Sequence, residues 1–442
     1  MAAIPAGIDT DRGPPMTVPL RHFVVGLGFL LAGVLSGATN GFATTGGSLP
    51  LVHVHLLLAG WVCVTIMGAM TQFVPVWSGT ELHSRRIATV QLWLVAGGLV
   101  GFVGALVLGA APWLGGAVVL CGFWLFVYNV ARTLLGVRPW DVTERHFAVA
   151  LGFFLLLSVL GLSLAVGFSR PVFTLANVPI THESARMAHV TVAVFGAVLT
   201  TVIGALYQLA TMFTQSELRG IDVHIRRFEE IGYPVGVVSL AGGRLFGVPT
   251  AGRIGGALIV VSVLGIGVLL ARRLYETRVE WTPMLRRYVV VSLAMIAWAL
   301  LTAPAWIRAP LDPTTLYGAP GTVHLLAIGV IGFVVFGTLY HVVPFIVWIH
   351  RYSDHLGLRD VPMIDELYDG RVAAVEFGLL VAGTATIVAG DLLGTSTVVA
   401  TGGRIAFAIG VSLFVANMLL VLVRHSPQTI VGILFDRVAR SA

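Results

Sequence analysis

Residues 53–79 read HVHLLLAGWVCVTIMGAMTQFVPVWSG, and this stretch decides the fold. It contains no Asp, Glu, Lys or Arg, and two histidines, His53 and His55, stand at its start. A helix that crosses a bilayer needs about 20 predominantly apolar residues. The stretch therefore predicts a membrane-spanning helix over 51–76 that carries two ionisable side chains near one end.

The composition of the whole chain agrees with a membrane protein. Of its 442 residues, 57% are hydrophobic and only 11% are charged, whereas soluble domains are about 25% charged. The arginines cluster at loop ends beside apolar runs, which is the pattern of membrane topology and not of nucleic-acid binding. Cys63 and Cys121 both fall in apolar segments, so neither a disulfide framework nor a zinc site is expected. We expect membrane lipid as a partner and no nucleic acid.

Further apolar runs along the chain predict an all-α integral membrane protein of about twelve spanning helices. The seventh run is the least regular, because Pro234 and five glycines interrupt it. Residues 1–19 are expected to form an N-terminal segment, 20–424 a single membrane domain and 425–442 a tail. The expected spans are 20–40, 51–76, 87–109, 112–134, 146–168, 185–213, 230–247, 252–271, 287–306, 320–348, 371–393 and 402–424.

The arginines also predict the orientation. The termini and the loops that follow even-numbered spans hold 21 arginines, and the opposite side holds 6. Positively charged residues concentrate on the cytoplasmic side of membrane proteins. We therefore expect a multi-pass protein of the cell membrane with both termini in the cytoplasm.

A four-helix unit recurs three times in the sequence. The units cover approximately residues 20–134, 146–271 and 287–424, and they predict a bundle with pseudo-threefold symmetry. The second span of each unit contains a histidine, and these histidines recur at nearly equal intervals along the chain. A glycine follows each histidine on the same span, slightly later in the second unit than in the other two. The histidines are His55, His189 and His324, and the glycines are Gly68, Gly204 and Gly337.

Four histidines are candidate metal ligands at the predicted outer ends of the second spans. Ionisable residues inside a membrane usually mark function, and neutral imidazole is a common ligand of haem iron and copper. A simple boundary role at the membrane interface is the alternative. His53 and His55 point about 200° apart on a helix, so they serve two centres, or one ligates and the other hydrogen-bonds. The candidates are His53, His55, His189 and His324.

Three further side chains carry weaker hypotheses. His182 precedes His189 by about two helical turns, which places the two on one helix face about 10.5 Å apart. His341 and Glu376 are candidates for proton transfer, although His341 also fits a hydrogen bond across a helix interface and an arginine could neutralise Glu376. The remaining histidines beside arginines are interpreted as interfacial, namely His22, His83, His146, His224, His350 and His355.

The opening stretch resembles a known motif. The run from His53 to Trp61, continued by Gly68-Ala69 and Val74-Pro75, is similar to the histidine-x-histidine helix of haem-copper oxidase and nitric oxide reductase catalytic subunits. Extended through residues 76–79, it also resembles the NnrS family of haem- and copper-containing membrane proteins associated with nitric oxide metabolism. The histidine pair lies in the second span here and in the tenth helix of the oxidases. NnrS-like proteins place it early, which favours that branch.

This resemblance implies a haem-binding membrane protein that handles electrons or a diatomic gas, nitric oxide or oxygen, in respiration or denitrification. It implies b-type haem, with copper as a further candidate, on His53, His55, His189 and His324, and a potential oxidoreductase activity. The chain has no CxxCH motif, so we expect electrons from a donor protein or from quinol, and partner subunits are expected. Two alternatives stay open: a transporter or channel without haem, and a non-catalytic subunit that keeps the bundle but no cofactor.

Overall fold

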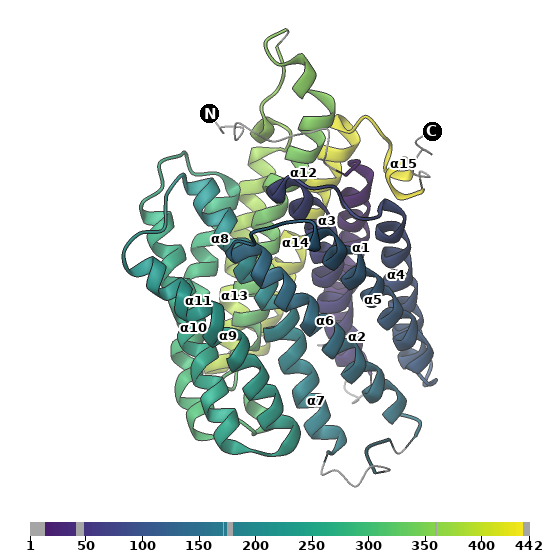
Figure 1. The fold of residues 1–442 in the computed structure, drawn as a ribbon, viewed down its shortest axis with the longest axis vertical. Helices are drawn as coiled ribbons and strands as arrows, with labels where there is room; N and C mark the ends of the chain where they lie inside the picture. Colours follow the sequence, from purple (N-terminus) through teal and green to yellow (C-terminus); the bar gives the residue numbers. More distant parts are fainter. Residues whose placement is uncertain (1–13, 41–47, 171, 175–179, 359, 436–442) are drawn as a thin grey trace.

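The computed structural model describes residues 14–40, 48–170, 172–174, 180–358 and 360–435. Most of the predicted N-terminal segment and the end of the predicted tail lie outside these ranges. The described residues form helices and connecting loops, without strands, which confirms the all-α prediction. Figure 1 shows the long helices side by side, with the start of α1 (Thr17–Asn40) and the end of α14 (Thr397–His425) at its upper end. We call this the terminal end and the opposite end the histidine end.

Eleven helical runs in the described part of the chain are long and apolar enough to cross a membrane. Each matches a predicted span to within a few residues. Besides α1 and α14 they are Leu49–Ser78 (α2, η1 and α3), α4 (Arg85–Val107), α5 (Trp113–Leu135), α6 (Val142–Gly167), His182–Thr214 (α7, η3 and α8), α10 (Pro249–Tyr275), α11 (Pro283–Arg308), Leu325–Arg351 (η5 and α12) and α13 (Gly370–Leu393).

The twelfth expected span corresponds to α9 (Ile221–Phe246), which is long enough to cross a membrane but too polar on average to meet the same criterion. Three of its charged side chains point inward, since Asp222, Glu229 and Arg244 are all buried. Its exposed large side chains include the apolar Phe228, Ile231, Val235 and Val238. These three charged residues therefore face the protein, while an apolar stripe faces outward. This arrangement suits a spanning helix despite the low average hydropathy.

The helices follow one order in three successive units. In each, a first helix packs against a long second helix, and a hairpin of two helices follows. The second helix is interrupted by a π-helical segment. Unit 1 contains α1, α2–η1–α3, α4 and α5. Unit 2 contains α6, α7–η3–α8, α9 and α10. Unit 3 contains α11, η5–α12, α13 and α14. The second helices comprise α2 (Leu49–His55), η1 (Leu56–Cys63), α3 (Val64–Ser78), α7 (His182–Thr191), η3 (Val192–Leu199), α8 (Thr200–Thr214), η5 (Leu325–Gly332) and α12 (Phe333–Arg351).

The π-helical segments give the register of the repeat, and they correct the sequence alignment. The residue directly before each segment is His55, Thr191 or His324, which we call the second position. Two positions earlier stand His53, His189 and Thr322, which we call the first position. His189 is therefore the counterpart of His53 and not, as the alignment predicted, of His55. Gly68 follows His53 at the same interval at which Gly204 follows His189, which agrees with this register.

Buried polar clusters repeat toward the terminal end. In unit 2 the imidazole of His146 contacts the carboxylate of Glu229 at 3.0 Å, and the hydroxyl of Tyr207 donates to the same carboxylate. In unit 3 Arg287 pairs with Glu376, to which the hydroxyl of Tyr340 donates at 3.1 Å. The prediction that His146 is interfacial is therefore wrong. His22, its unit 1 counterpart, is also buried, with 1% of its surface exposed.

Candidate functional site

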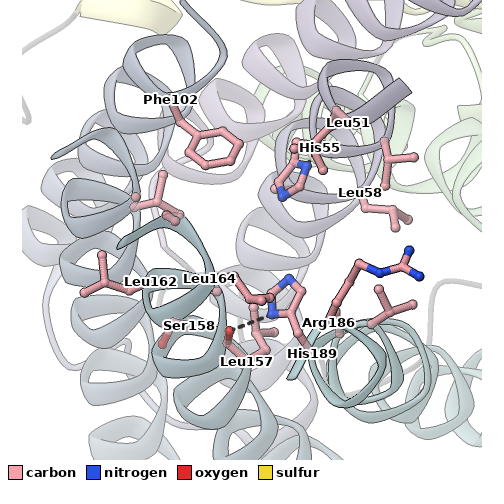
Figure 2. Close-up of a pocket in the computed structure, with 18 of the residues that line it drawn as sticks. Leu51, His55, Leu58, Phe102, Leu157, Ser158, Leu162, Leu164, Arg186 and His189 are labelled. Atoms are coloured by element: carbon pink, nitrogen blue, oxygen red, sulfur yellow. Dashed lines mark hydrogen bonds between the residues drawn. The ribbon is translucent and has the colours of Figure 1, made fainter. Parts of the chain in front are cut away.

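The first candidate site is a cavity of about 450 Å³ between units 1 and 2, which we call cavity A. His55 and His189 line it from opposite walls, and Figure 2 shows their rings pointing toward one another. Apolar side chains such as Phe102 and Leu162 form most of the remaining wall. Its volume falls in the range of roughly 300–1,000 Å³ that is usual for ligand sites.

The second candidate site, cavity B, has a volume of about 410 Å³ and lies between units 3 and 1. His53 and His324 line it together with Asp391 from α13 and Arg404 from α14. His53 and His55 therefore face different cavities, as two residues about 200° apart on a helix must. The two cavities share Val54 and Leu58 of one helix and Tyr317 of the loop after α11 in their walls, so this thin wall separates them.

The cavities obey the register of the repeat. Cavity A holds the second-position residue of unit 1, His55, and the first-position residue of unit 2, His189. Cavity B holds the second-position residue of unit 3, His324, and the first-position residue of unit 1, His53. Each cavity is thus built from one histidine of each kind, contributed by two neighbouring units.

All four histidines use the same ring nitrogen for hydrogen bonding. In each ring Nδ1 contacts an oxygen atom, and the described residues provide no hydrogen-bond partner for Nε2. An Nδ1–H that donates to an oxygen fixes the tautomer whose Nε2 lone pair is free for a metal. The Nδ1 contacts are His53 to the Gly33 carbonyl at 2.8 Å, His55 to the Leu51 carbonyl at 2.8 Å, His189 to the Leu157 carbonyl at 3.1 Å and His324 to Asp391 Oδ2 at 2.6 Å.

Two glycines make room for the first-position histidines. A Cβ atom on Gly37 would lie 2.5 Å from Cε1 of His53, and one on Gly161 would lie 2.9 Å from Cε1 of His189. Gly37 follows Arg21 at the same interval at which Gly161 follows Arg145, so the two glycines are counterparts. The first helix therefore supplies both the space and the carbonyl group that orient each of these rings.

The third interface, between units 2 and 3, is filled instead. Its second-position residue is Thr191 and its first-position residue is Thr322, and both are fully buried. The guanidinium of Arg244 donates to the hydroxyl of Thr191 at 2.8 Å and lies against the Trp306 ring. It also donates to three carbonyl groups of the loop after α11, those of Pro310, Thr315 and Leu316.

The remaining predicted site residues lie at varying distances from the cavities. His182 lines the rim of cavity A, where its ring packs edge-on against Phe173. His341 packs against Phe213 of unit 2 and lines neither cavity. Glu376 is neutralised by Arg287, as one of the two hypotheses for it expected, and the neutralising residue comes from α11. Proton transfer by His341 or Glu376 stays a prediction.

Sequence reasoning missed two contributors to these sites. Asp391 carries no sequence signal of its role, because its hydrogen bond to His324 depends on how α13 packs against the second helix of unit 3. Arg244 lies in the span with the weakest apolar signal, and that weakness was the available sign of a buried charge. Within the described residues, no group of three or more His, Cys, Asp or Glu side chains is placed to hold a metal ion. The geometry therefore offers pairs of histidines.

Comparison with known proteins adds no relative: no family model matches the chain, and no curated protein matches it.

Proposed function

We propose that this membrane protein binds haem in cavities A and B, where one histidine from each of two neighbouring units would hold the iron. The observation that carries the proposal is the pair of imidazoles that lines each cavity. Every member of these pairs has its Nδ1 engaged by an oxygen atom. Paired neutral imidazoles in an apolar cavity are the ligand set that a bis-histidine haem requires.

The surroundings of the histidines also suit haem. The walls of both cavities are largely apolar, which matches the flat ring system. Each cavity also has one arginine in its wall, Arg186 in cavity A and Arg404 in cavity B. Haem carries two propionate carboxylates, and guanidinium groups bind carboxylates through charge-assisted hydrogen bonds.

The ligand set favours electron transfer over gas chemistry. Bound haem supplies a one-electron couple whose potential is tuned by its axial ligands and by burial. If two histidines held each haem iron, no ligand position would stay open, and nitric oxide or oxygen would bind only after one imidazole leaves. The protein's own residues fix the ligand tautomers, exclude water and hold the two sites on opposite faces of one helix. Electrons would arrive from a donor protein or quinol, as the resemblance to oxidases and NnrS proteins implies.

The test is an absorption spectrum of the purified protein, expressed with haem supplied, combined with iron and copper analysis. We expect a Soret band and iron. His55→Ala should remove a large part of the band, because cavity A loses a ligand. Protein that contains copper and no iron, or that shows no Soret band, contradicts the proposal.

A matched control separates ligation from general damage. His224 also has its Nδ1 against a backbone carbonyl, that of Gly220, but it is exposed and lines neither cavity. His224→Ala should leave the Soret band unchanged. Equal loss of the band in His224→Ala and His55→Ala would show that the histidines act on stability and not on haem.

A further inference from the structure

One of the four candidate ligands differs from the others in its hydrogen-bond partner. His53, His55 and His189 each contact a backbone carbonyl, whereas His324 contacts a carboxylate oxygen of Asp391 at 2.6 Å. Both side chains of this pair are partly exposed and line cavity B, at 38% for His324 and 27% for Asp391. The carboxylate therefore lies at the cavity and not in the packed core.

The position of Asp391 belongs to the repeat. Asp391 follows the buried Glu376 of its helix at the same interval at which Arg244 follows the buried Glu229. Each of the two reaches the second-position residue of its own unit: Arg244 donates to Thr191, and Asp391 accepts from His324. In units 2 and 3, the third helix therefore carries at equivalent places a side chain, Arg244 or Asp391, that contacts the second-position residue of the same unit.

We propose that Asp391 is a positioning residue that makes His324 a strongly electron-donating ligand, and so sets the cofactor of cavity B at a lower reduction potential than that of cavity A. This inference rests on the haem proposal. A carboxylate that accepts the Nδ1–H of a ligating histidine fixes the ring and raises its basicity. Its negative charge also favours the oxidised, more positive iron over the reduced iron.

The consequence is a direction for electrons. Neither histidine of cavity A contacts a carboxylate through Nδ1, because Leu51 and Leu157 offer only neutral carbonyl groups. An electron that enters cavity B would then pass downhill to cavity A through the shared wall formed by Val54, Leu58 and Tyr317. Asp391 is the side chain that distinguishes two otherwise similar sites.

The experiment is a spectroscopic redox titration of the full-length protein and three variants. Asp391→Asn keeps the shape and an oxygen acceptor but removes the charge. It should raise the lower of the two midpoint potentials by about 59 mV, which corresponds to a tenfold change for a one-electron couple. Asp391→Glu should retain a low potential because it keeps the charge. Glu183→Gln removes a carboxylate that pairs with Arg186 beside cavity A, so it should leave the lower potential unchanged.

Removing one histidine from each cavity shows which midpoint potential belongs to the haem of that cavity. His53→Ala should abolish the low-potential component, and His189→Ala the high-potential one. If Asp391→Asn also loses haem from cavity B, retention of low-potential haem by Asp391→Glu supports the role of the charge.

Three outcomes overturn the inference. An unshifted low potential in Asp391→Asn overturns the role of Asp391 while leaving the haem proposal intact. Assignment of the lower reduction potential to the haem of cavity A also overturns the role of Asp391 and leaves the haem proposal intact. A wild-type protein without haem overturns both proposals together.

Discussion

Cavities A and B and the third interface occupy equivalent places in the bundle but differ in what fills them. Each is formed by the second-position residue of one unit and the first-position residue of the next. Where both residues are histidines, a cavity of about 410 or 450 Å³ lies beside them. Where both are threonines, Thr191 and Thr322 are fully buried, and Arg244 and Trp306 fill the space.

This contrast indicates that the helix arrangement does not by itself determine whether an interface contains a cavity. The three units share their helix order and their π-helical segments, and π-helical segments occur frequently at functional sites. The π-helical segment after Thr191 has the same length as the two segments after His55 and His324. A π-helical segment therefore does not by itself make a cavity. The side chains at two positions, together with Arg244, decide which interface opens and which closes.

The largest effect is expected from removing the side chain that fills the third interface. Arg244→Ala deletes the donors to three buried carbonyl groups and one hydroxyl. The Thr315 carbonyl keeps the Trp306 indole as a donor, but the carbonyls of Pro310 and Leu316 lose theirs. Each buried polar group left without a partner costs about 1–3 kcal/mol, so we expect a loss of several kcal/mol in the free energy of unfolding. Denaturant titration in detergent micelles measures it.

Arg253→Ala is the matched control for this prediction. Arg253 lies at the same end of the bundle and also donates to one carbonyl, that of Ile307, but it is exposed. Its removal should change stability by about 0.5 kcal/mol or less, as is usual for surface substitutions. Similar losses in both variants would show that Arg244 does not hold the interface closed.

A smaller effect is expected from placing histidines in the closed interface. The double variant Thr191→His, Thr322→His inserts two rings where both threonines are fully buried. Overpacking of this kind costs about 1–3 kcal/mol. Because Arg244 and Trp306 still fill the space, we expect reduced stability and an unchanged haem-to-protein ratio. A third haem per chain would show that the two positions alone specify a site.

The smallest effect is expected from narrowing the space beside one histidine. Gly37→Ala places a Cβ atom 2.5 Å from Cε1 of His53 and should displace that ring. Changes next to a metal ligand commonly cost about 10–100-fold in affinity, so haem affinity of cavity B should fall about tenfold. Gly28→Ala on the same helix meets nothing within 4 Å and should leave haem affinity unchanged. Equal affinities in both variants would refute the role of Gly37.

Much of the fold was predictable because hydropathy reports directly on membrane spans. The approximate boundaries of eleven helices followed from apolar runs, and the opposite directions of His53 and His55 followed from helical geometry. The weak seventh span had a physical cause, since averaging over a helix conceals that Glu229 and Arg244 point inward while Val235 and Val238 point outward.

The site was predicted less completely, because its register depends on local backbone geometry. The alignment of His55 with His189 accepted a glycine that comes later after His189 than after His55, although this difference pointed to His53 as the true counterpart. The π-helical segment that fixes the true register has no distinct sequence signal of its own. The contacts of Asp391 and Arg244 join residues that lie 67 and 53 positions apart, so only the packing of the helices reveals them.

The central claim is that two of the three interfaces bind haem through paired histidines, and the haem-to-protein ratio tests it most directly. We predict two haems per chain in the wild-type protein, one after His53→Ala, one after His189→Ala and none in the double variant. The single variants act on different cavities, so their losses should add. A ratio that is unchanged by both substitutions, or a loss of all haem after either one alone, would contradict the account.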